Sequence, residues 1–439
     1  MKIHITNLAA TLQLLLTVHI FPLAQHAGFF RRTRNYTLES FVHTLLFGWI
    51  EDPKAPLDSF APRLGVAPQS LAERLDDSAV RFARALLEAH LRQLFDADSR
   101  NQHLLNRFSA VIVEDSTIVS LPADAADDWP GCGNRIEGVG KAAVKINIRY
   151  ELKSGRLEHL GLHAGKDADA SLGANAEELP EGSLHLADLG YFDTKRWLAF
   201  NEGRYFISRA NSQVQLLRRQ GWQSVADFLR EQPAGVAQID RSVVINKGTL
   251  LPVRLVAIRC PEEVANRRKQ KLYQEAKRRC RAVSADRLTM CEWTVLITNV
   301  PASMLTSAEV WVMYRLRWQV ELWFKRGKQF GGWEQSHGRT AERVLVELWL
   351  KLTGTLIVMW LVLLRGGPLS DTSIWKRMRQ VRHYLNRLAA VLAATGKISV
   401  ELLEELVAAF DRIRKKIPRK IKPSSQDLLD KPELAFKKS

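Results

Sequence analysis

Apolar residues recur at steps of three and four along the first quarter of the chain, a spacing that predicts amphipathic helices. These helices are predicted over residues 8–24, 40–50, 64–75 and 79–95. Further along, the pattern changes to short apolar or alternating runs, which are typical of strands. The runs cover residues 110–113, 144–150, 157–163, 184–187 and 205–208. A mixed α/β region therefore begins near residue 108.

A second change of pattern follows residue 213. A predicted helix over residues 224–231 leads to alternating strands over 236–245 and 251–258. A helix over residues 262–281 comes next, a strand is predicted at 293–299, and helices continue to the end. We therefore expect an insertion rich in strands, at about residues 212–290, inside the α/β region.

Two strongly apolar runs raise the question of a membrane. The run at residues 8–24 resembles a signal peptide, but Asn7, Gln13 and His19 interrupt it, which favours a buried helix. The run at residues 352–364 is shorter than the roughly 20 residues that a spanning helix needs. We interpret it as a core helix and expect no contact with a membrane.

The composition indicates a folded protein with a polyanionic partner. Hydrophobic residues make up 46% and charged residues 25%, which excludes a disordered chain. The net charge is +17, and the segment 262–281 carries eight Lys/Arg against three Glu. Nucleic acid is the first candidate partner and an anionic membrane surface the second. Within this segment, Arg267 and Arg268 are predicted contacts to a DNA backbone.

The four cysteines form no CxxC pair and have no zinc-binding spacing. A disulfide framework is not expected in so long a chain. A reducing compartment, such as the cytoplasm, fits better.

The segment from residue 314 to 328 has the most informative spacing. If it is one helix, Tyr314, Arg317, Glu321 and Lys328 lie along a single stripe. The opposite side would carry the apolar side chains of the segment, Leu316, Val320 and Trp323. A carboxylate among cations makes sense if it holds a divalent metal that a phosphate also touches. The alternative is a solvated helix face with a Glu321–Lys325 pair.

Two further carboxylates follow predicted strands. Asp115 comes after the strand at residues 110–113, and Asp188 comes after the strand at 184–187. Acidic groups at adjacent strand ends, with one more from a helix, suit a two-metal site for phosphoryl transfer. The alternative for each aspartate alone is a turn or a helix N-cap. Together with Glu321, the metal site becomes the preferred interpretation.

These residues resemble a known family. Asp115-Ser-Thr, Asp188-Leu-Gly-Tyr and Tyr314-x2-Arg317-x3-Glu321-x6-Lys328 are similar to motifs of the DDE insertion-sequence transposases, in the Tyr-Arg-Glu-Lys subgroup. The last motif fixes four residue types in fifteen positions, and the resemblance covers about residues 35–365. It implies an RNase H-like fold with an insertion between the second aspartate and the glutamate.

The resemblance also implies roles for single residues. Asp115, Asp188 and Glu321 would be catalytic and would hold two Mg²⁺ ions, with Mn²⁺ as a possible substitute. The phosphates near the cut DNA end would contact four side chains of the 314–328 segment, namely Tyr314, Arg317, Lys325 and Lys328. Trp293 matches a position where an indole stacks on a flipped base, although a buried strand tryptophan fits equally well.

The predicted fold class is α/β. An RNase H-like core with a β-rich insertion follows an all-helical N-terminal domain and precedes C-terminal helices. The five predicted segments are a helical DNA-binding domain, the first core part, the insertion, the second core part and a basic C-terminal region. Their bounds are 1–107, 108–211, 212–290, 291–365 and 366–439.

Smaller signals carry weaker predictions. Residues 62–75 could form a helix-turn-helix with Arg63 and Arg74 facing phosphates, or common scaffolding. The segment His337-Gly-Arg339 could touch DNA. His163 and His185 lack metal spacing, and we expect them to be structural or surface groups. The glycines at residues 131–140 are predicted turns, and the basic tail after Arg412 is predicted to be partly mobile.

The function implied is a DNA transposase. Water would attack the phosphodiester at the end of the element, and the 3′-hydroxyl released would attack target DNA in line. The partners would be double-stranded transposon ends and target DNA, with a homodimer on the DNA. Two alternatives stay open: a sequence-specific DNA-binding regulator without catalysis, and an RNase H-like nuclease that cuts but does not join.

Overall fold

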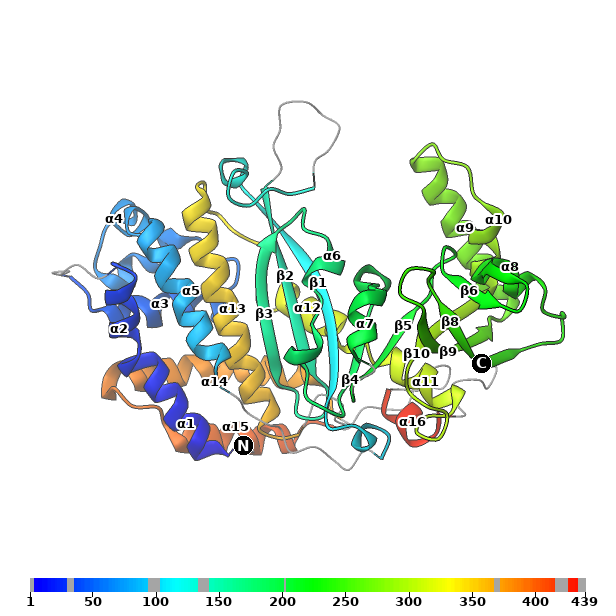
Figure 1. The fold of residues 1–439 in the computed structure, drawn as a ribbon. Coiled ribbons are helices and arrows are strands. Elements are labelled where there is room, and N and C mark those ends of the chain that lie inside the picture. The colour runs from blue at the N-terminus through cyan, green and yellow to red at the C-terminus, as the bar shows by residue number, and fades with distance from the viewer. Residues whose placement is uncertain are drawn as a thin grey trace. The chain divides into compact units, whose positions relative to one another are not determined.

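A computed structural model describes most of the chain, in two compact units (Figure 1). The described residues are 4–29, 35–93, 103–132, 142–200, 203–366, 372–414 and 425–432. Unit 1 comprises Met1–Asn101, Asp115–Asp167 and Gln319–Pro418, and unit 2 comprises Gln102–Glu114, Ala168–Trp318 and Arg419–Ser439. Each unit therefore combines segments that are far apart in the sequence. The five-segment organisation stays a prediction.

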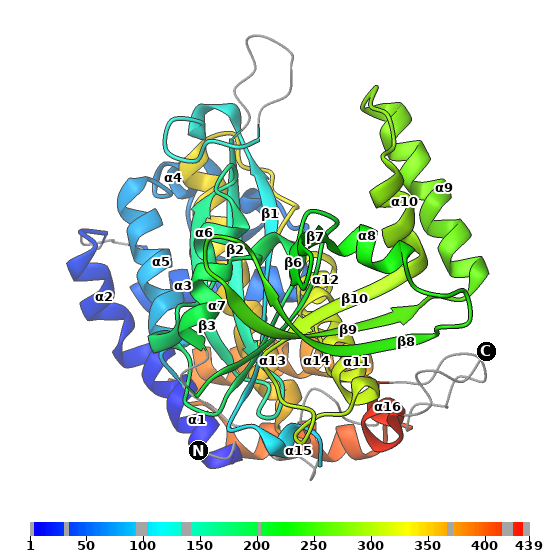
Figure 2. The same cartoon turned by 45° about the vertical axis from the view of Figure 1, so that its right-hand side comes forward.

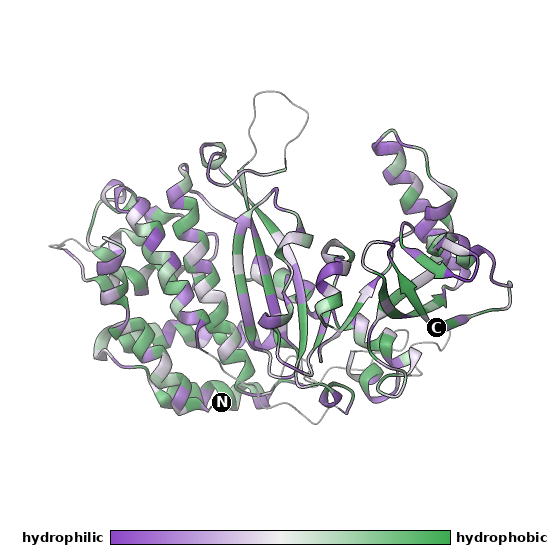
Figure 3. Ribbon diagram, in the orientation of Figure 1, coloured by the Kyte–Doolittle hydropathy of each residue, from purple (hydrophilic) through white to green (hydrophobic). Residues whose placement is uncertain are grey.

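Unit 1 is mainly helical. Its longer helices are α1 (Ile5–Gln13), α2 (Ile20–His26), α3 (Leu38–Glu51), α5 (Asp77–Leu91), α12 (Trp318–Gln329), α13 (Ala341–Leu363), α14 (Ile374–Thr395) and α15 (Val400–Asp411). Helix α13 contacts α3, α5 and α14. Every residue from Val344 to Leu363 is buried, and Figure 3 shows how hydrophobic this helix is. The predicted core helix is confirmed.

Two helical segments are long and apolar enough to cross a membrane by length and composition, Ile5–His26 and Ala341–Leu363. The apolar window of the second is 100% buried inside the protein, as expected of a core helix. The first is helical, as predicted, with a π-helical turn at Leu14–Val18. It buries one face, including Leu8 and Ile20, and exposes Val18.

Unit 1 also contains a β-hairpin. Strands β2 (Ala142–Glu151) and β3 (Leu157–Ala164) pair antiparallel from Val144↔Ala164 to Tyr150↔Leu157. All residues of β2 are buried, so both faces of this strand are covered. The alternating pattern predicted both strands correctly. Strand β1 (Val111–Leu121) is longer than predicted, and its residues from Asp115 onward belong to this unit.

Unit 2 is built on a mixed sheet. Its strands include β4 (Leu184–Ala187), β5 (Tyr205–Arg209), β6 (Gln215–Arg218), β7 (Gly221–Ser224), β8 (Gln238–Ile245), β9 (Leu251–Arg259) and β10 (Trp293–Thr298). The first residues of β1 form one edge strand of this unit's part of the sheet. From there the neighbouring strands lie in the order β1-β4-β5-β10-β9-β8-β6-β7. The pairs β1–β4 and β4–β5 are parallel, and the others are antiparallel.

The insertion is rich in strands, as predicted, but it continues this sheet. Figure 2 shows β8, β9 and β10 side by side, and all of β10 pairs with β9, from Trp293↔Arg259 to Thr298↔Arg254. One hydrophobic core runs under both parts and includes Phe206 before the insertion, Leu255 within it and Trp293 after it. The strands β6 and β7 were missed, because they lack the continuous apolar run of β4: of their residues only Leu216 is buried.

The prediction of one helix over residues 314–328 is wrong. Helix α11 (Ser307–Arg315) ends before Arg317, and α12 begins at Trp318. The backbone N–H groups of Leu316 and Arg317 bond three residues back, to Met313 and Tyr314, at 3.0 and 3.1 Å. Such bonds close a helix. The buried positions Met313, Leu316 and Val320 keep a helical spacing across the break, so the sequence hides it.

Candidate active site

The strands β1 and β4 place two of the predicted carboxylates at equivalent positions. They pair in parallel register from Val111↔Leu184 to Glu114↔Ala187. The residues that follow this last pair in the chain are Asp115 and Asp188. Strand β4 ends at Ala187, and the carboxyl ends of parallel strands are where such sheets hold their ligands, whereas β1 continues to Leu121.

Asp115 does not fit the alternative of a turn or a helix N-cap, and Asp188 fits it in position but not in side-chain bonding. Asp115 lies inside β1 and is no turn residue, and its Oδ1 accepts the N–H of Ser116 at 2.8 Å. Asp188 occupies the N-cap position of a short 3₁₀ turn, Leu189–Tyr191, but its side chain makes no capping hydrogen bond. The Asp188 carboxylate therefore has another use than closing that turn.

A buried pair ties the two strands together directly before these aspartates. Glu114 is fully buried and His185 is 3% exposed, and Oε2 of Glu114 lies 2.8 Å from Nε2 of His185. The same oxygen accepts the backbone N–H of Ala174 at 3.0 Å. A buried carboxylate needs such partners. His185 is structural, as predicted, and the pair joins β1 to β4.

Asp188 has two partners from the end of α11. The Tyr314 hydroxyl donates to Oδ1 of Asp188 at 3.2 Å, and Nε of Arg317 lies 3.9 Å from the same oxygen. Burial raises the pKa of Tyr314, and the negative charge of Asp188 raises it further. The phenol is thus protonated at neutral pH and remains a donor. Tyr314, predicted to contact phosphate, here orients a candidate metal ligand.

The sequence did not single out Arg209, which belongs to the same group. Its charge acts on Tyr314, where it lowers the pKa against the larger effect of burial. Arg209 is exposed and ends β5, which runs parallel to β4. A cation directly after an apolar strand was the available signal. Trp318, which the motif leaves unspecified, is 56% exposed, and this is unusual for an indole.

The remaining motif residues lie on α12. Glu321 is in its first turn, and Lys328 is in its last turn. Lys328 Nζ donates to the backbone oxygen of Ile118 at 3.1 Å and pairs with Glu334 at 2.5 Å. Lys325 is exposed. Lys328 is thus held by its own unit, whereas Lys325 points to solvent.

The structure brings Asp188, Tyr314 and Arg317 together in unit 2. Asp115, Glu321 and Lys328 belong to unit 1. Among the described residues, no group of three or more His, Cys, Asp or Glu side chains is placed to hold a metal ion. The three-carboxylate site therefore stays a prediction.

Two predicted DNA contacts are used inside the protein. Trp293 is 1% exposed, and the guanidinium of Arg259 covers its ring at 4.4 Å. No face of this indole is open to a base, so the alternative of a buried strand tryptophan is correct for this structure. Arg268 donates to the backbone oxygen of Trp293 and to Oγ1 of Thr294, both at 3.1 Å.

The basic helix is confirmed as α9 (Glu262–Arg278). Arg268 anchors it to β10, since its guanidinium bonds to that strand. Arg267 is exposed, as a DNA contact requires. The adjacent cations therefore differ: one holds the helix in place, and the other is accessible.

The predicted helix-turn-helix is absent from residues 62–75, all of which are described. Pro62–Leu64 is a 3₁₀ turn, and α4 (Pro68–Glu73) has only six residues. Elsewhere, His337 Nε2 lies 2.9 Å from the backbone oxygen of Lys54. The predicted glycine turns lie mostly within residues 133–141, outside the described residues, as does most of the tail, 415–424 and 433–439.

Comparison with known proteins gives a consistent family. The family model of the transposase DDE domain matches residues 106–357, more than half of the chain. The transposase for insertion sequence element IS231F of Bacillus thuringiensis subsp. israelensis is 24% identical over 82% of this chain and 80% of its own length. The transposase for IS1151 of Clostridium perfringens is 24% identical, over 77% and 76%. A putative transposase for IS186A of Escherichia coli is 30% identical over 44% of this chain and 53% of that protein.

Proposed function

This chain belongs to the DDE-domain transposases, and we propose that it cuts DNA at the ends of an insertion sequence and joins those ends to target DNA. The observation that carries the proposal is the register of β1 and β4, which makes Asp115 and Asp188 equivalent residues of neighbouring parallel strands. Tyr314 and Arg317 at the Asp188 carboxylate support it, because they belong to the same motif.

The donor set proposed for the metal is Asp115, Asp188 and Glu321. Carboxylate oxygens are hard ligands that suit Mg²⁺, and Mn²⁺ would substitute. The Asp188 side chain is 45% exposed and is no part of a closed buried ion pair, so it can bind a cation. Two bound ions would lower the cost of charge on the attacking and leaving oxygens of the phosphodiester.

The chain's own side chains would bind and orient the DNA strand. The Tyr314 phenol would hold the Asp188 carboxylate in one orientation through its hydrogen bond. Arg317 and Arg209 would bind phosphate oxygens beside that carboxylate. Lys325, Lys328 and Arg267 would contact the backbone further away, and the net charge of +17 supports binding of a polyanion.

The strand sequence supports an RNase H-like core for this reaction. Strand β1 is followed in the chain by the antiparallel β2–β3 hairpin, and then by β4 and β5, which continue parallel to β1. We further propose the Tyr-Arg-Glu-Lys subgroup, double-stranded end and target DNA as partners, a homodimer on the DNA, and action in the bacterial cytoplasm at the nucleoid. The bacterial relatives support this setting.

A strand-transfer assay tests the proposal. Labelled DNA carrying the ends of the element is incubated with a target plasmid, with Mg²⁺ or with EDTA. We expect nicked ends and joined products with Mg²⁺ and neither with EDTA. Binding without any cleavage would instead indicate a regulator, and cleavage without joining would indicate a nuclease. Either result contradicts the proposed function.

Removal of the Tyr314 hydroxyl should lower the affinity of the proposed site for Mg²⁺. In Tyr314→Phe, Asp188 loses its donor at 3.2 Å while the ring stays in place. Loss of such an outer partner typically costs about 10- to 100-fold in metal affinity or activity. Cleavage rates measured over a Mg²⁺ series should show a higher half-saturating concentration. Tyr205→Phe, in β5 of the same unit, is the control, and equal behaviour of both variants would contradict the role of Tyr314.

A further inference from the structure

A pocket in unit 1 lies apart from the residues discussed so far. Its volume is about 390 Å³, within the usual range of ligand sites. Three parts of the chain line it: the end of α3 with the segment after it, the end of α4, and the loop between α12 and α13 with the start of α13. The lining side chains include Trp49, Leu57, Leu75, Arg339 and Arg343.

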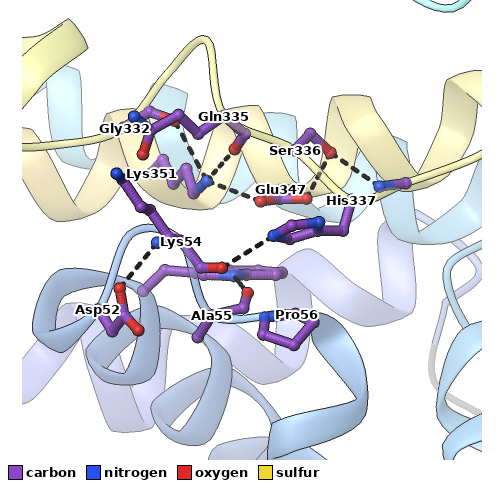
Figure 4. Close-up of polar contacts among 12 residues, drawn as sticks. Asp52, Lys54, Ala55, Pro56, Gly332, Gln335, Ser336, His337, Glu347 and Lys351 are labelled. Atoms are coloured by element: carbon purple, nitrogen blue, oxygen red, sulfur yellow. Dashed lines mark hydrogen bonds and ion pairs between the residues drawn. The ribbon is translucent and has the colours of Figure 1, made fainter.

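The wall formed by the α12–α13 loop is held in place by a buried ion pair (Figure 4). Lys351 Nζ lies 2.6 Å from Oε1 of Glu347, and their side chains are 1% and 8% exposed. The same ammonium group donates to the backbone oxygens of Gly332, at 3.2 Å, and Gln335. The Ser336 hydroxyl donates to the other oxygen of Glu347 at 2.5 Å.

The opposite wall is fixed to the same loop. His337 Nε2 lies 2.9 Å from the backbone oxygen of Lys54, and Trp49 Nε1 donates to the backbone oxygen of Ala55 at 3.1 Å. Figure 4 shows the first of these bonds joining the segment after α3 to the loop, and the second joins α3 to that same segment. The pocket is therefore bounded on both sides by hydrogen-bonded backbone. Such a site is pre-formed and would lose little entropy on binding a ligand.

The charge left unmatched in the pocket is positive. Arg339 is exposed and Arg343 is half-buried, and neither guanidinium makes a hydrogen bond or ion pair with a described residue. Glu347 is neutralised by Lys351, so Asp58 is the one lining carboxylate left to oppose the two arginines. A guanidinium offers paired donors that match a phosphate.

We propose that this pocket binds one nucleotide, with its phosphate on Arg339 and Arg343 and its sugar and base on the apolar wall. Pro56, Leu57 and Leu75 supply that wall, and an apolar surface suits the face of a base. The nucleotide belongs to a DNA strand or is free in solution. The first source rests on the proposed function, because it extends the DNA contact to unit 1.

The test measures nucleotide binding without any reaction. A fluorescein-labelled five-nucleotide single strand is titrated with the full chain in EDTA, and the anisotropy is followed; unlabelled dAMP is the competitor. Each lost charge-assisted contact should cost about tenfold in affinity. The pocket variants are the double substitution Arg339→Ala/Arg343→Ala and Ala72→Phe, which fills the pocket without a change of charge.

The matched control is Arg92→Ala/Arg379→Ala. Both arginines are exposed in unit 1 and lie outside the pocket, so the same charge is lost. Thermal unfolding checks that every variant is folded. We expect the affinity of both pocket variants for the labelled strand to fall tenfold or more below that of the wild type. We expect the affinity of the control to stay within threefold of the wild type.

If dAMP displaces the labelled strand, the pocket also binds free nucleotides. If dAMP does not displace it, the pocket binds a nucleotide only as part of a DNA strand. Pocket variants that lose no more affinity than the control, or a wild-type chain that binds no strand, would overturn the proposal. Absent Mg²⁺-dependent cleavage in the strand-transfer assay would instead contradict the proposed function and leave this binding result standing.

Discussion

We expect Asp188→Ala to lower the rate of Mg²⁺-dependent strand cleavage by at least about 1,000-fold. We expect its affinity for end DNA to stay within about threefold of the wild type. The large effect on rate follows from the position of Asp188. Asp188 directly follows the last residue of β4 that pairs with β1, and its carboxylate accepts a hydrogen bond from the Tyr314 hydroxyl. Without its carboxylate, the proposed metal site loses a ligand that Asp115 and Glu321 cannot replace.

The small effect on binding follows from the neighbouring charges. Arg317 lies 3.9 Å from Asp188, and Arg209 is close enough to act on Tyr314. Both cations stay in the variant, and one repelling carboxylate is removed, so phosphate binding is preserved. Single-turnover cleavage and anisotropy on the same DNA separate the two effects. Asp286→Ala, which removes a half-buried carboxylate of the same unit that pairs with Arg230, is the control.

Asn at this position refines the test, because Asp188→Asn keeps the shape and the hydrogen bond to Tyr314 but removes the charge. We expect Asp188→Asn to be as inactive as the alanine variant, since a neutral amide is a poor ligand for a hard cation. If Asp188→Ala still nicks end DNA in Mg²⁺ at a rate near that of the wild type, the assignment of Asp188 is wrong.

Much of the fold was predictable, because burial imposes a period on the sequence. The helical spacing of α5 reports one buried face. The same dependence on burial explains why the break between α11 and α12 at Leu316 was not predictable. Its apolar positions keep the helical period on both sides of the break, and neither proline nor glycine marks it.

The candidate site was predictable where residue type and place in an element coincide. Asp188 follows β4 and Asp115 lies inside β1, and the register of β1 and β4 pairs the residues directly before them. Contacts between distant side chains were not predictable. The Tyr314–Asp188 hydrogen bond spans 126 residues, and the cover of Arg259 over Trp293 depends on how β9 and β10 pair. Sequence spacing carries no information on either contact.

Lys351→Ala should destabilise unit 1 by about 3–5 kcal/mol, the usual cost of breaking a buried ion pair from one side. The substitution leaves the buried Glu347 carboxylate without its cation, at 8% exposure, and removes the donor to the Gly332 and Gln335 backbone oxygens. Burial already lowers the pKa of Lys351, although Glu347 opposes this shift. The ion pair thus holds the loop between α12 and α13 in place. The cost of removing the two charged groups from water is compensated only while both side chains are present.

Urea unfolding of the variant, followed by circular dichroism, measures this cost. Lys376→Ala, which removes an exposed lysine from α14, should stay within about 0.5 kcal/mol of the wild type. The double variant Glu347→Leu/Lys351→Met should recover most of the loss, because apolar side chains of similar volume replace a buried ion pair at little cost. If Lys351→Ala unfolds like the Lys376 variant, the pair does not hold the loop, and the pre-formed wall of the nucleotide pocket loses its physical basis.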